Sequence, residues 1–257
     1  MIKVLFVGDI VGSVGLETFK KNLADLKAKH KIDAVIVNGE NSDERNGISR
    51  KSAEYLFSAG ADVITGGNHS FKHSDIYEYL DENDFILRPE NYSKSSPGKG
   101  VCVIDKLSYK IMILNLAGRV YMESADDPFS IAKDIVERHS DCAVKIIDFH
   151  AEATSEKAAL AHFLKGSVSA VLGTHTHVQT NDAKILEGGT AFITDVGMTG
   201  PYDSILGVQV KNIIDKFTLS TPVRFSQSKG IGNFCGILLT IDEKTGKTAQ
   251  IETLNTI

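Results

Sequence analysis

The sequence has no excess of positive charge. Its 257 residues contain 28 lysines and arginines against 33 aspartates and glutamates, which gives a formal net charge of −5 at pH 7. Proteins that track long nucleic acids carry strongly basic surfaces, so this balance argues against a long nucleic-acid partner. A small or short substrate agrees better with the composition.

Paired cysteines are also missing. The three cysteines, Cys102, Cys142 and Cys235, are odd in number, far apart, and lie in or beside apolar runs. This spacing indicates neither a disulfide framework nor a thiolate metal site. We expect reduced core thiols and therefore a reducing compartment, the cytoplasm.

Long uncharged apolar stretches are absent as well. Asp9 interrupts the N-terminal apolar run before it could form the core of a signal peptide. No other stretch of membrane-spanning length is free of charges. We therefore expect a cytoplasmic protein that makes no membrane contact.

Nothing in the sequence divides the chain into parts. It contains no internal repeat, low-complexity tract or linker, and 257 residues suffice to bury one substantial core. We expect a single domain over residues 1–257. Whether this domain forms a homo-oligomer is left open.

The order of apolar and amphipathic segments predicts an α/β fold. The first part alternates strand and helix, which is typical of parallel strands, whereas the second half is richer in strands. Two packed sheets flanked by helices fit this order better than one open sheet. The predicted helices cover 16–30, 49–59 and 128–139, and the predicted strands cover 3–7, 34–37, 63–65, 100–104, 110–115, 144–149, 170–174, 191–194, 211–219 and 234–241.

Five of the apolar runs end in side chains that can hold a metal ion. These residues are Asp9, Glu40 with Asn41, Asn68 with His69, His150, and His175 with His177. Sheets of α/β proteins place their ligand sites beyond the carboxyl ends of such strands. The recurrence therefore predicts a metal site at one edge of the sheets.

Each of these residues also has an ordinary explanation on its own. Asp9 could be a turn residue or a helix cap, and His150 a hydrogen-bonded core histidine. The pair His175 and His177 is more specific, because alternation in an extended segment would turn both imidazoles to the same side. Together, the strand-end positions favour metal binding over chance.

The motifs in their order resemble the calcineurin-like dinuclear metallophosphoesterases, and more closely the YmdB-like branch of that group. The residues that carry this resemblance are Gly8-Asp9, Gly39-Glu40-Asn41, Gly66-Gly67-Asn68-His69, the run from Asp148 to Lys157, Gly173-Thr174-His175-Thr176-His177, and the run from Ile193 to Asp203. The resemblance covers essentially the whole chain.

This resemblance implies a fold, a pair of cations and a reaction. The fold is a four-layer αββα sandwich of two mixed sheets, of the metallo-dependent phosphatase type. By carry-over, one ion is held by Asp9, Glu40, Asn41 and His177, the other by Glu40, Asn68, His150 and His175, and His69 is the proton donor. Glu40 then bridges the ions, which we expect to be iron or manganese, with zinc or magnesium as alternatives.

The implied activity is hydrolysis of 2′,3′-cyclic nucleotides and related phosphoesters by a hydroxide bridging the two ions. A phosphomonoesterase such as a nucleotidase would use nearly the same ligands, and a nucleotide-sensing regulator would keep the site with little turnover. Two departures from the wider pattern stand out. Val11 replaces a usual histidine ligand, and Ser70 replaces the usual carboxylate after His69.

Overall fold

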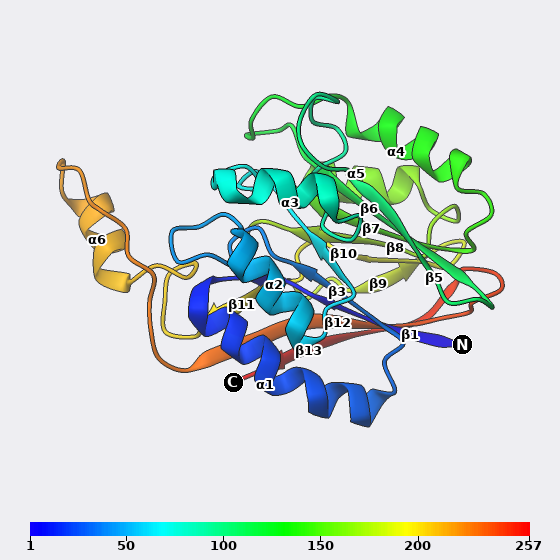
Figure 1. Ribbon diagram of the computed structural model, residues 1–257, viewed down its shortest axis with the longest axis horizontal. Coiled ribbons are helices and arrows are strands. Elements are labelled where there is room, and N and C mark those ends of the chain that lie inside the picture. The colour runs from blue at the N-terminus through cyan, green and yellow to red at the C-terminus, as the bar shows by residue number, and fades with distance from the viewer.

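The computed structural model describes residues 1–257 and contains two mixed β-sheets that lie face to face (Figure 1). The first sheet has the order β2-β11-β12-β1-β3-β4, and β13 pairs with β12 outside this order. Its strands are β1 (Ile2–Val7), β2 (Asp9–Ile10), β3 (Ala34–Asn38), β4 (Val63–Thr65), β11 (Met198–Pro201), β12 (Gly232–Ile241) and β13 (Thr248–Thr256).

The second sheet has the order β5-β6-β7-β8-β10-β9. Its strands are β5 (Val101–Asp105), β6 (Lys110–Ala117), β7 (Val144–His150), β8 (Ala170–Thr174), β9 (Lys184–Leu186) and β10 (Thr190–Ile193). Within it, β6, β7 and β8 are parallel, as β1, β3 and β4 are in the first sheet. The predicted pair of mixed sheets is confirmed.

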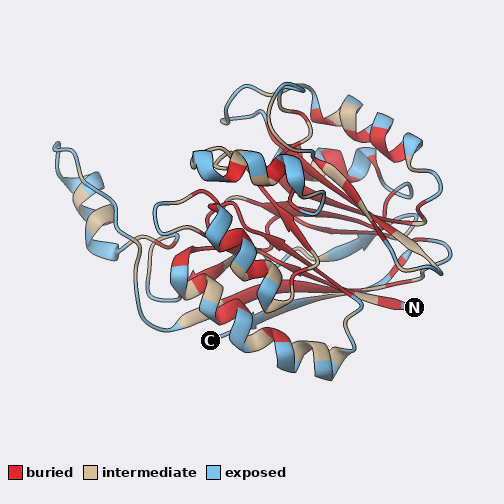
Figure 2. Ribbon diagram, in the orientation of Figure 1, coloured by how far each residue is buried: buried red, intermediate tan, exposed pale blue.

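Helices cover the outer face of each sheet. The helices α1 (Gly12–His30), α2 (Arg50–Ala59) and α3 (Tyr77–Glu82), with the 3₁₀ turn η1 (Ser74–Ile76), flank the first sheet, and α4 (Pro128–Arg138) and α5 (Thr154–Phe163) flank the second. Figure 2 shows buried residues concentrated in the sheets and in the inner faces of these helices. The helix α1 begins one turn earlier than predicted.

Strand alternation explains the layers. In β1, Val4 and Phe6 point into a core shared by the two sheets, whereas Leu5 and Val7 pack against the helices. The second sheet is divided in the same way between the shared core and the core under α4 and α5. Successive side chains of a strand point to opposite faces, so both sheets are buried on both sides. The four-layer αββα sandwich is confirmed.

One predicted strand is wrong. All but the last residue of the segment 211–219 lie in the helix α6 (Val210–Thr218). None of the residues of α6 is buried, and the helix projects from the body of the protein (Figures 1 and 2). Val210, Ile214 and Phe217 recur at intervals of four and three residues, which is the spacing of one helix face. The β-branched pair at 213–214 suggested a strand, but the helical period is the stronger feature. The polar edge strand β13 was not predicted.

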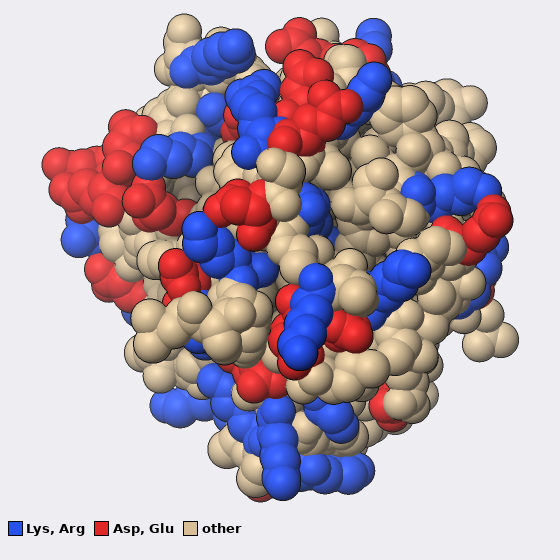
Figure 3. Space-filling view, turned by 90° about the vertical axis from the view of Figure 1, so that its right-hand side faces the viewer, with Lys and Arg blue, Asp and Glu red and all other residues tan.

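The surface and the cysteines agree with the composition. On the face at the amino end of β1, acidic and basic side chains are interspersed and no continuous basic track crosses it (Figure 3). All three cysteines are free and buried, as predicted. None of the six α-helices has the length and apolar character needed to cross a bilayer.

Candidate metal centre

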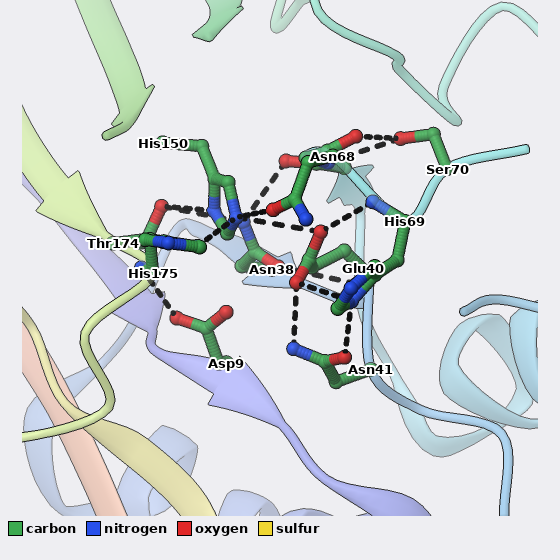
Figure 4. A network of polar contacts seen from close by, with 12 residues as sticks. Asp9, Asn38, Glu40, Asn41, Asn68, His69, Ser70, His150, Thr174 and His175 are labelled. Atoms are coloured by element: carbon green, nitrogen blue, oxygen red, sulfur yellow. Dashed lines mark hydrogen bonds and ion pairs between the residues drawn. The ribbon is translucent and has the colours of Figure 1, made fainter. Parts of the chain in front are cut away.

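All eight predicted site residues meet at the carboxyl ends of the parallel strands, and Figure 4 labels all of them but His177. They are Asp9 after β1, Glu40 and Asn41 after β3, Asn68 and His69 after β4, His150 at the end of β7, and His175 and His177 after β8. Strand register aligns the strand ends within the second sheet, because Ala117 at the end of β6, His150 and Thr174 are neighbours across parallel strands. The packing of the two sheets brings the strand ends of the first sheet to the same place. Segments far apart in the sequence therefore lie together at the edge formed by the carboxyl ends of the strands.

Glu40 lies at the middle of the site. Its side chain is fully buried, with Oε1 2.6 Å from Asn41 Nδ2 and Oε2 3.3 Å from His150 Nε2. Oε2 also accepts a hydrogen bond from the backbone N–H of His69, at 2.9 Å. Burial opposes ionisation, but the charge and hydrogen bond of His150 hold the pKa of Glu40 well below its usual range. Its two carboxylate oxygens therefore face two different groups of side chains.

The first group contains Asp9, Asn41 and His177. His177 Nε2 is 3.7 Å from Asp9 Oδ1 and 3.2 Å from Asn41 Nδ2. Asp9 Oδ1 is buried and has no hydrogen-bond partner. Burial raises the pKa of Asp9 despite the opposing attraction of His177. An unpartnered buried carboxylate oxygen is costly, and a cation would satisfy it.

The second group contains Asn68, His150 and His175. His150 Nε2 lies 3.0 Å from Asn68 Oδ1 and 3.1 Å from His175 Nδ1. Ligand atoms of Glu40, His150 and His175 all lie within 4.8 Å of one another. Burial disfavours the charge on His150, but Glu40 above all raises the pKa of His150 to about 9. Burial lowers the pKa of His175 to about 4, with the charge of His150 acting in the same direction.

A buried relay fixes the orientation of His150. Thr174 Oγ1 donates to Asp148 Oδ1 at 2.7 Å, so the same hydroxyl accepts from His150 Nδ1 at 2.9 Å. In the neutral form of His150, which a cation selects, this arrangement leaves the lone pair of Nε2 for a ligand, as is usual for metal-binding histidines. Asp148 also accepts from Asn38 and Thr65, and burial raises its pKa to about 6. These residues were missed, although polar side chains inside apolar strands are a readable signal.

The donor set fits two cations. Carboxylate, amide and imidazole ligands without thiolate suit iron, manganese, zinc or magnesium. Gly67 leaves the required space, because a Cβ at this position would lie 2.4 Å from Glu40 Oε2 and 2.5 Å from His150 Nε2. Any larger residue would therefore push the side chains of Glu40 and His150 out of place.

The loop of His175 and His177 differs from the prediction. Neither residue is in an extended segment, since His175 has φ 100° and His177 has φ 65°, both in the left-handed region. The two side chains still reach the same site, but strand alternation is not the reason. Non-glycine residues with positive φ are strained and persist only where surrounding contacts fix them.

A buried carboxylate supplies those contacts. Asp195 Oδ2 accepts from the backbone N–H of Thr176 at 3.0 Å and from its hydroxyl at 2.8 Å. The same oxygen is 2.9 Å from Lys157 Nζ, and both charged side chains are fully buried. This Thr176–Asp195–Lys157 clamp holds the residue between the two histidines. The sequence left open whether Asp195 supports the site or belongs to a structural loop, and it gave no sign of its partner on α5.

Asp195→Asn should weaken both stability and cation binding. Losing one partner of a buried ion pair costs about 3–5 kcal/mol, and disturbing groups that orient metal ligands costs about 10–100-fold in metal affinity. Urea unfolding and a metal titration measure the two effects. The matched double variant Lys157→Met with Asp195→Leu should regain the part of the stability that the unpaired charge costs but not the affinity, because Thr176 and Gly197 lack their acceptor. Wild-type affinity in the double variant would contradict the clamp.

His69 borders the open part of the site. Its Nδ1 lies 2.8 Å from Asn41 Oδ1, and its side chain is 24% exposed. It lines a cavity of about 270 Å³ together with Glu152, which lies 3.2 Å from His175 Nε2. Ser70, where a carboxylate was missing, turns away and instead closes a turn with Gly67 through its hydroxyl. The ring partners of His69 are therefore the Asn41 amide and Glu40 Oε1, 3.2 Å from Nδ1, and not a carboxylate at position 70.

Comparison with known proteins decides the family. A family model described as YmdB-like protein matches residues 5–254. The chain belongs to the YmdB-like family. This YmdB-like chain is 43% identical over 252 residues to the 2′,3′-cyclic-nucleotide 2′-phosphodiesterase of Bacillus subtilis strain 168, a match that covers 98% of this chain and 96% of that protein.

Solved structures agree with the YmdB-like assignment. A crystal structure described as a phosphatase from Mycoplasma pneumoniae has a TM-score of 0.94 at 36% identity, covering 99% of this chain and 93% of that one. A protein of Thermus thermophilus has a TM-score of 0.93 at 38% identity, covering 99% of both chains. The predicted family and the metallophosphoesterase-type fold are confirmed, and with them the prediction of an enzyme, a phosphoesterase.

Proposed function

We propose that this YmdB-like chain hydrolyses 2′,3′-cyclic nucleotides and related phosphodiesters at a centre of two cations. The observation that carries the proposal is the position of Glu40, whose two buried oxygens face two separate groups of ligands (Figure 4). The name of the Bacillus subtilis relative supports the substrate class. His69, at the border of the same cavity, supplies the acid that such a reaction needs.

Each group of side chains would hold one cation. Glu40 would contribute to both, with Asp9, Asn41 and His177 on one side and Asn68, His150 and His175 on the other. Iron or manganese suits this mixed oxygen and nitrogen set best, with zinc or magnesium as alternatives. When bound, such cations make a strong nucleophile available at neutral pH and offset the negative charge of the phosphoryl group.

Asn41 and Glu40 fix the ring of His69. Nδ1 of His69 lies 2.8 Å from Asn41 Oδ1 and 3.2 Å from Glu40 Oε1, so Nδ1 carries a proton that it donates to these oxygens. In the imidazolium form of His69 the second proton is on Nε2, and the ring becomes a neutral imidazole once that proton has been transferred.

His69 would complete the reaction by protonating the leaving group. Water adds across the cyclic ester, so that its hydroxyl joins phosphorus while the bond from phosphorus to one ribose oxygen breaks. That oxygen takes the Nε2 proton of the His69 imidazolium and leaves as a hydroxyl group. The product is a nucleoside monophosphate, and the second proton of water later restores His69.

A substrate panel tests this function against its alternatives. The same manganese-loaded sample should hydrolyse 2′,3′-cyclic AMP and leave adenosine 3′-monophosphate intact. Release of inorganic phosphate from the monophosphate at a comparable rate would identify a phosphomonoesterase instead. Tight binding of both compounds without turnover would identify a nucleotide sensor.

A further inference from the structure

We propose that a second cavity beside His69 binds the nucleobase of the substrate, with Phe71 and Tyr92 as the aromatic surface on which the base stacks. This inference rests on the proposed function and extends it to substrate recognition. The cavity has a volume of about 510 Å³, within the usual range of small-molecule sites. It is distinct from the smaller cavity at the metal centre.

The cavity has no lining residue in common with the metal centre, but two short links connect their walls. Phe71 lies two residues beyond His69, in a turn closed by a 3.1 Å hydrogen bond from Lys72 N–H to the His69 carbonyl. On the other side, Asn91 Oδ1 accepts from the backbone N–H of Ala117, the strand neighbour of His150. These links place the cavity near the centre, and the base of a nucleotide whose phosphate lies at the centre would extend toward it.

The aromatic rings are fixed and partly open. The ring of Phe71 packs edge-on against Tyr77 at a centroid distance of 5.8 Å and lies 6.3 Å from the ring of Tyr92. Phe71 and Tyr92 are only partly buried, and both line the cavity. Every base has a flat π-face, so such rings bind bases with little dependence on sequence.

The charges around the cavity exclude a second phosphate. Lys94 is the one cationic lining residue, against Glu123 and Asp126. This balance repels an anion but accepts the neutral, donor-rich edge of a base. Burial, with the charges of Glu123 and Glu40, raises the pKa of Tyr92, so its hydroxyl stays protonated and able to donate.

The buried side-chain amide of Asn91 holds the wall of the cavity in place before a substrate binds. Asn91 is fully buried, and its Nδ2 donates to the carbonyls of Ala117 at 2.8 Å and Asp126 at 3.0 Å. The backbone N–H of Asp126 returns a hydrogen bond to the Asn91 carbonyl at 2.9 Å. The wall that carries Glu123 and Asp126 is thus tied to the strand ends of the metal centre, and a base need not order it on binding.

Phe71→Leu and Tyr92→Leu test the inference, because leucine keeps an apolar side chain but removes the ring. With manganese-loaded enzyme, each should raise KM for 2′,3′-cyclic AMP about tenfold, the loss expected for one stacking contact. KM for glycerol 1,2-cyclic phosphate, which has no base, should not change. Phe85→Leu, an exposed ring outside the cavity, should affect neither substrate.

An equal change in KM for both substrates, or none for either, would overturn the inference while leaving phosphodiesterase activity in place. If the wild-type enzyme hydrolyses neither substrate, the proposed function fails separately. Equilibrium dialysis with adenosine, which has no phosphate, then tests whether the cavity binds a base. Binding that is lost in both leucine variants supports it, and binding that is absent or unchanged contradicts it.

Discussion

Glu40→Gln should lower kcat/KM for 2′,3′-cyclic AMP by about 10³-fold or more and release the cations from both positions. Glutamine fills the same buried space but has one oxygen instead of two and no charge. The two groups of ligands then no longer share a negatively charged carboxylate. A bound cation contributes several kcal/mol of charge stabilisation, and about 4 kcal/mol corresponds to 10³-fold in rate.

Metal content after dialysis and steady-state hydrolysis measure this effect. Glu44→Gln is the matched control, because Glu44 follows four residues later in the same loop but is exposed. It should keep both cations and nearly full turnover. A Glu40→Gln enzyme that retains two cations per chain and wild-type turnover would contradict the bridging role.

His69→Ala should lower kcat for 2′,3′-cyclic AMP by about 10²–10⁴-fold, the usual contribution of a positioned acid. Cation content should not change, because His69 contacts Asn41 and Glu40 without belonging to either ligand group. The loss should nearly vanish for bis(p-nitrophenyl) phosphate. Its leaving group is stable as an anion and needs no proton.

The comparison of these two substrates separates proton donation from a structural role. His73→Ala serves as control, since His73 Nε2 contacts only the loop carbonyl of Asn46, at 2.8 Å, and Asp43. It should leave both reactions unchanged. An equal loss on both substrates in His69→Ala would show that the residue holds the site together and does not donate the proton.

The strand ends could be predicted from the sequence because two independent signals coincide there. Apolar runs such as 34–37 and 144–149 mark buried strands, and parallel strands bring their carboxyl ends to one edge. Within one sheet, the polar residues that follow, such as Asp9 and Glu40, are therefore expected to be neighbours. Glu40 and His150 belong to different sheets and meet because the two sheets pack face to face. The structure brings them together as the topology requires.

Other features depend on contacts that no local pattern contains. The left-handed backbone of His175 and His177 depends on Asp195, some twenty residues away, and on Lys157 of the helix α5. The relay from Asp148 exists only where β7 and β8 are paired. For α6 the local pattern was present but misread, because β-branched residues favour strands while their spacing favours a helix.

Diffraction at the manganese absorption edge, from crystals grown in excess manganese, tests the shared centre most directly. Two anomalous peaks are predicted, one on each side of the Glu40 carboxylate. One should lie among Asp9, Asn41 and His177, and the other among Asn68, His150 and His175. A single peak, or peaks that do not adjoin Glu40, would contradict the account.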